Sequence, residues 1–172
     1  VFNGEIYNHI ELRGGILSKV DFKTNSDTEV ILHLYALYGV NCLEYLRGMF
    51  AFAVFDSQNN TLFLARDRVG IKPLYVCEVK GVVMFASEVK TLLPFLQHHD
   101  VNNEALNEYL HFNYCLGGKT LVAGINEIEP PLISVEDNDG DPDTIGEGTV
   151  EFIEDDDFNF SLASVSQERP YN

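Results

Sequence analysis

The 172-residue sequence has no tryptophan and few basic residues. Lys and Arg together number 11 against 27 Asp and Glu, so the formal net charge at pH 7 is −16. A chain this acidic repels phosphate backbones, and we therefore expect no nucleic-acid partner. No apolar run approaches the roughly 20 residues of a membrane helix, and the first residues, VFNGEIYNH, show no signal-peptide pattern. We therefore expect no membrane association.

Cysteine is also scarce. Cys42, Cys77 and Cys115 are widely spaced, odd in number and contain no C-x-x-C pair, which argues against a disulfide framework and a metal site. This usage fits a reducing, cytoplasmic setting. Cys42 and Cys77 lie in an apolar helical run and a strand-like run, so we predict small buried hydrophobic side chains rather than nucleophiles.

The composition changes near residue 133. Overall, 45% hydrophobic and 22% charged residues are near the globular average, so a compact core can form. We predict one folded domain over residues 1–133. Residues 134–172 are strongly acidic and have too little contiguous apolar sequence to bury, which predicts a disordered tail. Alternating aspartates from Asp137 to Asp143 could suggest calcium, but the Gly and Glu positions of an EF-hand loop are not met, so a solvated tail is favoured.

Residues 1–133 alternate helical and strand signals. Ser26-x-x-Glu29 is a capping-box spacing and Gly39 is a helix stop, which together predict a helix. Four apolar runs between residues 49 and 88 are joined by short connections, which predicts an antiparallel meander. The first run is apolar at nearly every position, so we expect layers on both of its faces. Further helices are predicted over residues 88–96 and 103–112, and the fold class is α+β.

Three features could carry chemistry. The turn dipeptide Asn3-Gly4 could direct a side-chain amide and a backbone N–H at one oxygen, as in an oxyanion hole, although a plain turn is the commoner meaning. Asp27 lies in the first turn of the predicted helix, where stabilisation of the helix dipole is the simpler interpretation. The segment ARDRVGIKPLY is rich in basic residues, but a loop paired to nearby acidic groups is favoured over an anion site.

The order of the motifs indicates a family. FNGEIYNHIELR, TNSDTEVILHLYALYG, CLEYLRGMFAFAVFD, LFLARDRVGIKPLYV and FASEVKTLL together resemble the class II glutamine amidotransferase domain of glutamine-hydrolysing asparagine synthetases. The resemblance runs from Val1 to about Pro130 and includes NEALNEYLHFNY and GKTLVAGINEIEP. Five long motifs in order make the resemblance highly specific.

The resemblance implies an N-terminal nucleophile hydrolase fold, in which antiparallel sheets are sandwiched between helix layers. It implies L-glutamine as substrate, attacked by the thiol of a first-residue cysteine whose own α-amino group acts as the base. The family's oxyanion hole falls on Asn3 and Gly4. Its clamp for the substrate α-ammonium falls on Glu5 and Asp27, since two carboxylates suit an ammonium group. No cofactor is implied for this domain.

The sequence also departs from the family pattern. The cysteine, a strand, an RGPD-type loop and a carboxylate-binding arginine should precede FNGEIYN, so we expect an N-terminally truncated domain that does not hydrolyse glutamine by itself. The family's C-terminal synthetase domain, which uses ATP and Mg to amidate aspartate, is also missing from the sequence. Homodimerisation stays open. The alternatives are a non-catalytic amidotransferase-like binding module and a related class II amidotransferase with another acceptor.

Overall fold

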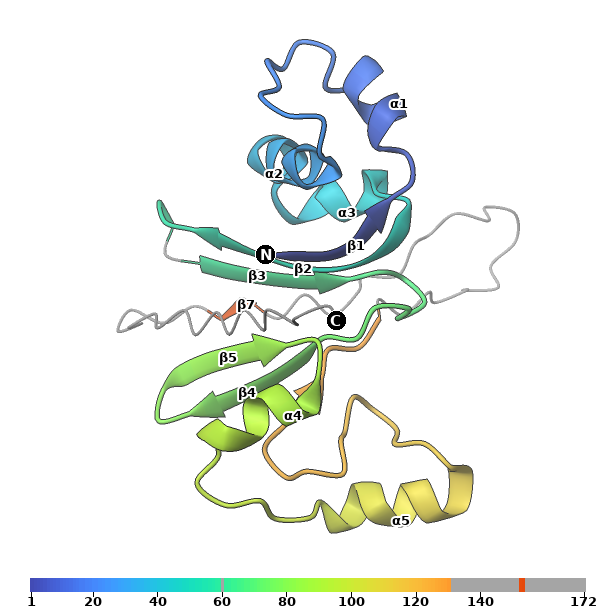
Figure 1. The fold of residues 1–172 in the computed structure, drawn as a ribbon, viewed down its shortest axis with the longest axis vertical. Coiled ribbons are helices and arrows are strands. Elements are labelled where there is room, and N and C mark those ends of the chain that lie inside the picture. The colour runs from blue at the N-terminus through green and yellow to red at the C-terminus, as the bar shows by residue number, and fades with distance from the viewer. Residues whose placement is uncertain (60, 131–151, 154–172) are drawn as a thin grey trace, which may run out of the picture.

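The computed structural model describes residues 1–59, 61–130 and 152–153, and Figure 1 shows their arrangement in layers. Helices α1 to α3 cover one face of a first sheet, a second sheet lies below it, and α4 and α5 lie beyond the second sheet. The elements in chain order are β1 (Phe2–Ile6), α1 (His9–Gly14), α2 (Asp27–Tyr38), η1 (Gly39–Asn41), α3 (Cys42–Tyr45), β2 (Gly48–Asp56), β3 (Thr61–Arg66), β4 (Tyr75–Val79), β5 (Val82–Ala86), α4 (Val89–Leu92), η2 (Leu93–Phe95), α5 (Asn103–Phe112), β6 (Asn126–Glu127) and β7 (Phe152–Ile153).

The first sheet is antiparallel, with strand order β1-β2-β3-β7. Its register sets Gly4 opposite Phe50 and Ile6 opposite Gly48. In this order β1 is an outermost strand among the described residues. The last strand, β7, falls within residues 134–172. The other residues of that predicted tail lie outside the described part of the chain, including the alternating aspartates from Asp137 to Asp143.

The second sheet is also antiparallel and has the order β5-β4-β6. All four predicted strands are therefore present, but the prediction that they form one meander is wrong. β2 and β3 form a hairpin in the first sheet, whereas β4 and β5 form a hairpin in the second. The chain passes from the first sheet to the second between Asp67 and Leu74. Hydrogen bonds within this segment, from backbone N–H groups to the Asp67 carboxylate, hold it in a loop, so β4 does not pair with β3.

The strand β2 packs on both faces, as predicted from its apolar sequence. Phe50, Phe52 and Val54 belong to a core beneath the helices, and Ala51 and Ala53 belong to a second core facing the other sheet. The small alanines allow the two sheets to approach. The first core also contains Val30, Ile31, Leu34, Leu46 and Phe63, and the second contains Leu62, Leu64, Leu74, Val83 and Ile128. The predicted α+β fold of antiparallel sheets between helix layers is confirmed.

The helix α2 begins and ends where its sequence predicts. The hydroxyl of Ser26 accepts a hydrogen bond from the N–H of Thr28 at 3.2 Å, and Gly39 ends the helix at φ 58°. The reciprocal half of the predicted capping box is wrong. Glu29 bonds to the backbone N–H groups of Lys23 and Thr24 instead of reaching back to Ser26. The glutamate is therefore used to hold the loop before the helix.

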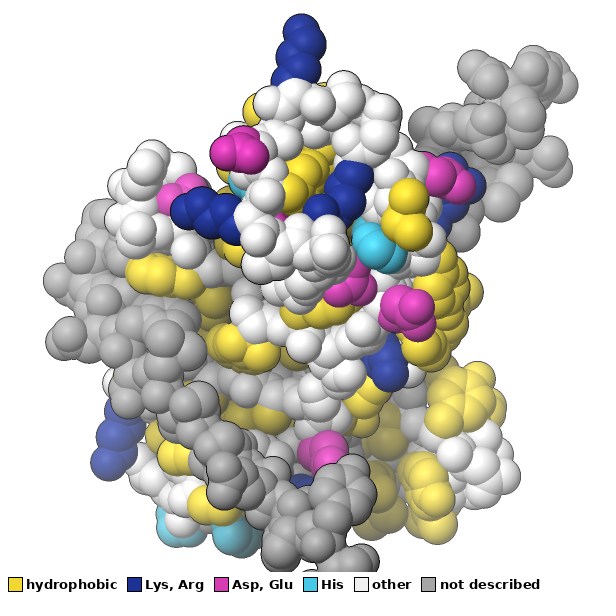
Figure 2. Space-filling view, turned by 45° about the horizontal axis from the view of Figure 1, so that its top comes forward, with side chains coloured by type: hydrophobic (Ala, Val, Ile, Leu, Met, Phe, Trp, Pro, Cys, Tyr) yellow, Lys and Arg dark blue, Asp and Glu magenta, His cyan; other side chains and the backbone are white. Residues whose placement is uncertain are grey.

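Charged side chains are dispersed on the face that carries α1 and α2. Figure 2 shows acidic and basic groups interspersed there, with no continuous basic patch. Among the described residues, no helix is both long and apolar enough to cross a membrane. In the same part of the chain, no three His, Cys, Asp or Glu side chains gather as a metal site would require.

Candidate functional site: an open strand edge

Asn3 and Gly4 lie inside β1 and not in a turn, which corrects the prediction from their sequence. Gly4 has φ 139°, and a Cβ atom there would lie 2.1 Å from the carbonyl oxygen of Met49 and 2.7 Å from the Cα of Phe50. The dipeptide therefore does not reverse the chain. Glycine is needed because β1 and β2 approach too closely at this point for any side chain.

The outer edge of β1 exposes backbone donors. Val1 and Ala53 exchange hydrogen bonds in both directions, each 2.9 Å long. In an antiparallel pair such exchanges recur at every second residue, so Asn3 also faces β2 with its backbone groups. The intervening N–H groups of Gly4 and Ile6 then point away from β2. β1 is outermost among the described strands of its sheet, so no described strand covers the edge that these two donors face.

A carboxylate already accepts a hydrogen bond from one of these two N–H groups. Oδ2 of Asp27 accepts a hydrogen bond from the N–H of Ile6 at 3.0 Å. Asp27 is the first residue of α2, so the start of that helix lies against the strand edge. The N–H of Gly4 lies two residues back along the strand, or ~7 Å from that of Ile6. The edge therefore carries a carboxylate at one end and an exposed N–H donor at the other.

The side chains of Asn3 and Glu5 project from one face of β1, since they are two residues apart. Nδ2 of Asn3 donates to Oγ of Ser87 at 3.0 Å. Glu5 is exposed, and within the described residues its carboxylate has no hydrogen-bond or ion-pair partner. Glu5 also precedes Ile6, whose N–H holds Asp27. Two carboxylates thus flank the same short stretch of strand edge, where a cationic group could bind.

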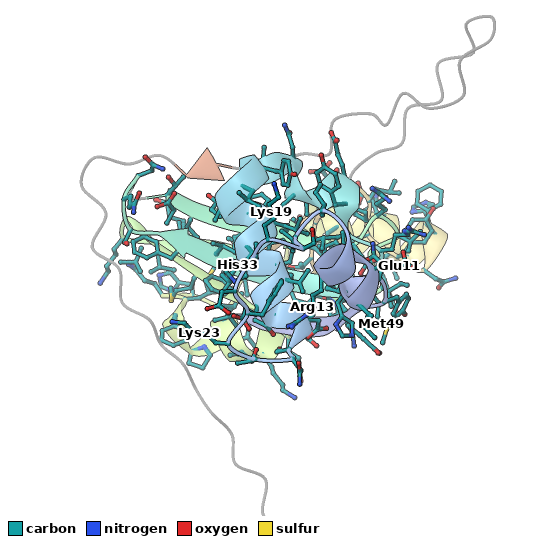
Figure 3. The ribbon with its side chains drawn as sticks, turned by 90° about the horizontal axis from the view of Figure 1, so that it is seen from above. Glu11, Arg13, Lys19, Lys23, His33 and Met49 are labelled. Atoms are coloured by element: carbon teal, nitrogen blue, oxygen red, sulfur yellow. The ribbon has the colours of Figure 1, made fainter. Side chains whose placement is uncertain are left out.

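The loop before Asp27 is held by Arg13. Its guanidinium donates to the carbonyl oxygens of Thr24 and Ser26 at 2.8 and 2.7 Å, and lies 4.1 Å from the centre of the Phe22 ring. Figure 3 shows Arg13 on the side of α1 that faces α2. These contacts fix the carbonyls on both sides of Asn25, so the start of α2 is placed accurately against β1.

Glu29 holds the same loop from the other side. Its carboxylate accepts hydrogen bonds from the N–H groups of Lys23 and Thr24 and from the Thr24 hydroxyl, at 2.6 to 2.8 Å. The Thr24 hydroxyl bond, followed by the Lys23 N–H bond, lowers the pKa of Glu29 to about 2. Glu29 is therefore an anion throughout the physiological range. Arg13 and Glu29 together support Asp27 without touching it.

Comparison with known proteins identifies the family. A family model described as a glutamine amidotransferase domain matches residues 1–143, which is most of the chain. The chain belongs to this family. The family predicted from the sequence motifs is thereby confirmed.

The relatives of this amidotransferase domain are longer proteins. Asparagine synthetase [glutamine-hydrolyzing] 1 of Bacillus subtilis is 43% identical over 131 residues, which cover 76% of this chain and 21% of that protein. A putative asparagine synthetase [glutamine-hydrolyzing] of Mycobacterium tuberculosis is 40% identical over 135 residues, covering 75% of this chain and 21% of that protein. The chain spans about a fifth of the length of these relatives. Among solved structures, glutamine phosphoribosylpyrophosphate amidotransferase from B. subtilis matches 54% of this chain and 22% of its own, with 28% identity and a TM-score of 0.47.

The basic loop of the amidotransferase domain is structural, as the sequence favoured. Nη1 of Arg66 donates to Oε1 of Glu127 and to the carbonyl oxygen of Ile128, both at 2.8 Å, and Nη2 donates to the carbonyl oxygen of Gly70 at 2.6 Å. The guanidinium is nearly buried by these contacts. The guanidinium of Arg66 therefore connects β3 of the first sheet to β6, and it is not exposed for binding an anion.

Asp67, the next residue, organises the crossing between the sheets. It is only 1% exposed. Burial raises the pKa of Asp67, but hydrogen bonds from the N–H groups of Ile71, Lys72, Phe50 and Val69 together outweigh burial and lower the pKa below its usual value. The carboxylate thus ties β2 to the segment that leads into the second sheet.

The three cysteines do not line the open edge of β1. Cys42 is fully buried in the core beneath the helices, and burial raises its pKa to about 12. Cys77 lies in β4 and is buried in a cluster with Leu92 of α4 and Ile125, and burial raises its pKa as well. Sγ of Cys115 lies 3.7 Å from the carbonyl oxygen of Ala105 in α5. The prediction that Cys42 and Cys77 are buried hydrophobic side chains is confirmed.

Sequence reasoning missed three residues that support the predicted site. Ser87 contacts Asn3, and Arg13 and Glu29 hold the loop before Asp27. Glu29 was assigned to the helix cap instead, and Arg13 carried no signal beyond its place in FNGEIYNHIELR. Ser87 is 84 residues from Asn3, so no local pattern could have paired them.

Proposed function

We propose that this amidotransferase domain is the glutamine-hydrolysing part of an asparagine synthetase and that L-glutamine binds along the open edge of β1. The relatives, which are glutamine-hydrolysing asparagine synthetases, support the first statement. The second rests mainly on one observation. The strand β1 carries the N–H of Gly4 and the side-chain amide of Asn3 side by side, and the carboxylate of Asp27 is bonded to the same strand at Ile6.

In this proposal Asn3 and Gly4 form the oxyanion hole. Nucleophilic attack on the glutamine carboxamide moves negative charge to its oxygen, and hydrogen-bond donors already aimed at that oxygen lower the barrier. The N–H of Gly4 is fixed by the strand, and one hydrogen of the Asn3 amide is held by Ser87. Both donors therefore need little rearrangement when the charge develops.

Glu5 and Asp27 hold the α-ammonium group of the substrate in the same proposal. Oδ2 of Asp27 is used by the Ile6 N–H, which leaves Oδ1 for a ligand. The separation of ~7 Å between the N–H groups of Ile6 and Gly4 suits an extended glutamine, with its α-ammonium at one end and its carboxamide at the other. Charge-assisted hydrogen bonds to an ammonium are stronger than neutral ones, so this contact would fix the substrate's direction.

The nucleophile and the ammonia acceptor complete the proposal. The family resemblance implies an N-terminal cysteine as nucleophile, and Cys42, Cys77 and Cys115 are all placed elsewhere. We therefore expect the 172-residue chain alone to release no ammonia from glutamine. The ammonia produced by the complete enzyme would serve a synthetase domain that amidates aspartate with ATP and Mg. This domain itself would need no cofactor, and the cytoplasm is its expected location.

The test uses a cysteine-initiated protein, defined as this chain fused behind the N-terminal segment of B. subtilis asparagine synthetase 1 that precedes the position aligned with Val1. It should release ammonia from glutamine, whereas the 172-residue chain should not. Asn3→Ala should lower kcat by about 10²- to 10³-fold, with KM changed only a few-fold, because a transition-state donor is lost.

Asn107→Ala in α5 is the matched control and should leave both constants unchanged. A cysteine-initiated protein whose Asn3→Ala variant turns over glutamine within a few-fold of the parent would contradict the oxyanion assignment. Ammonia release by the 172-residue chain that is lost on mutating one of its cysteines would show that a different nucleophile operates.

A further inference from the structure

We propose that Ser87 is a positioning residue that aims the side-chain amide of Asn3 at the developing oxyanion. This inference rests on the proposed glutaminase function and deepens it. It assigns a role to the second sheet, because Ser87 comes directly after β5 whereas Asn3 lies in β1 of the first sheet.

The contact joins the two side chains directly. Oγ of Ser87 accepts a hydrogen bond from Nδ2 of Asn3 at 3.0 Å. In the described part of the chain this is the one hydrogen bond made by the Asn3 side chain. Ser87 is therefore the group that holds the amide plane in place.

The chemistry of a primary amide explains why this matters. Its nitrogen carries two hydrogens, whereas its oxygen carries none, so only one of the two orientations of the plane offers a donor on a given side. Ser87 takes one hydrogen of Asn3 and leaves the second for another acceptor. The contact with Ser87 restrains rotation of the amide about the last side-chain bond. Without this restraint the amide oxygen could turn toward the oxyanion, which it would repel.

The contact contributes little to the fold. Asn3 is exposed, Ser87 is half-buried, and neither belongs to a hydrophobic core cluster. Removing the hydroxyl should therefore leave folding intact and change the reaction, which allows positioning to be separated from a purely structural effect.

The test measures kcat, KM and melting temperature for Ser87→Ala in the cysteine-initiated protein. The expected result is a kcat lowered about 10-fold, less than the loss from removing the Asn3 donor itself, with KM within 2-fold and the melting temperature unchanged. Ser87→Thr keeps the hydroxyl and should recover most of the turnover. Ser57→Ala, in the turn after β2, is the matched control and should have no effect.

Coupling to Asn3 gives the second readout. Once Asn3 is alanine there is no amide to aim, so adding Ser87→Ala to Asn3→Ala should lower kcat no further. A Ser87→Ala variant with normal kcat, a Ser87→Thr variant as slow as Ser87→Ala, or full additivity with Asn3→Ala would each overturn the inference.

The two proposals fail in different ways. A normal kcat for Asn3→Ala would refute the oxyanion hole and this inference with it. A slow Asn3→Ala beside a normal Ser87→Ala would refute the positioning role alone. If Ser87→Ala proved too unstable to assay, the kcat of Ser87→Thr would still be compared with that of Asn3→Ala. A Ser87→Thr kcat as low as that of Asn3→Ala would count against the inference.

Discussion

Replacing Asp27 with Asn separates substrate binding from the structural role of this residue. Each oxygen of the Asp27 carboxylate has its own proposed role. Oδ2 holds the N–H of Ile6 at 3.0 Å, and Oδ1 is assigned to the α-ammonium of glutamine. Asparagine can keep the first contact through its amide oxygen, but it loses the negative charge. The start of α2 should also survive, because Ser26 is the residue that caps this helix.

The size of the effect follows from the contact that is weakened. A hydrogen bond between charged groups contributes about 1.5 to 3 kcal/mol, and 1.4 kcal/mol corresponds to a tenfold change in affinity. Asp27 is partly exposed, so solvent screening places the loss at the lower end of this range. We therefore expect KM for glutamine to rise about 10-fold in the cysteine-initiated protein, with kcat changed much less, because the ammonium carries the same charge in the ground state and in the transition state.

The assay compares glutamine with its analogue that lacks the α-amino group. This analogue has no ammonium for Asp27 to bind, so Asp27→Asn should raise its KM far less than that of glutamine. Asp100→Asn provides a control for the loss of one negative charge elsewhere, and should change neither constant.

Two results would refute the clamp. Equal increases in KM for glutamine and for the des-amino analogue would mean that Asp27 does not contact the ammonium. A clear fall in melting temperature with unchanged KM values would instead mean that the carboxylate acts only on the fold, through Ile6 or through the helix dipole.

Two further predictions concern the fold around the site. Gly4→Ala should lower the melting temperature strongly, because its Cβ would lie 2.1 Å from the Met49 carbonyl oxygen, whereas Gly14→Ala, with no atom within 4 Å, should be neutral or stabilising in thermal melts. Asp67→Asn should lower the free energy of unfolding at pH 7 by about 2 to 4 kcal/mol in denaturant titrations, because one amide oxygen replaces two carboxylate acceptors for four N–H groups. The folded-state pKa of Asp67 is lowered, so its contribution is present above the unfolded value of about 3.9 and disappears as the pH falls through the folded value. Below about pH 4, the free energy of unfolding of Asp67→Asn should therefore depend less on pH than that of the parent protein, and an equal pH dependence would contradict this assignment.

Local signals in the sequence were enough to place the elements. Ser26 and Gly39 mark the two ends of α2 as predicted, and the continuous apolar run around Phe52 predicted a strand that is buried on both faces. These features depend on residues close together in the chain, where capping and periodicity act.

The pairing of the strands could not be predicted in the same way. Short connections suggested one meander, but the segment after β3 crosses to the second sheet because Asp67 bonds to Phe50 of β2 and to its own loop. Tertiary packing decides whether the Asp67 carboxylate and its N–H partners are buried, and the sequence of the loop does not show this.

Tertiary contacts also decide how the residues of the proposed site are placed. The turn propensity of Asn3-Gly4 was misleading, because the close approach of Met49 requires a glycine inside a strand. The motifs named the residues of the proposed site, but they did not predict the side chains that hold those residues in place. Ser87 reaches Asn3 from the other sheet, and only the folded structure brings the two together.

Binding of glutamine along the open edge of β1 is tested most directly by a crystal structure of the cysteine-initiated protein acylated by a γ-glutamyl electrophile that traps its nucleophile. We expect the carbonyl oxygen of the trapped acyl group to lie about 2.7 to 3.1 Å from both Nδ2 of Asn3 and the backbone nitrogen of Gly4. Its α-ammonium should contact Oδ1 of Asp27. An acyl group whose oxygen lies away from the open edge of β1, or whose ammonium faces solvent, would contradict the account.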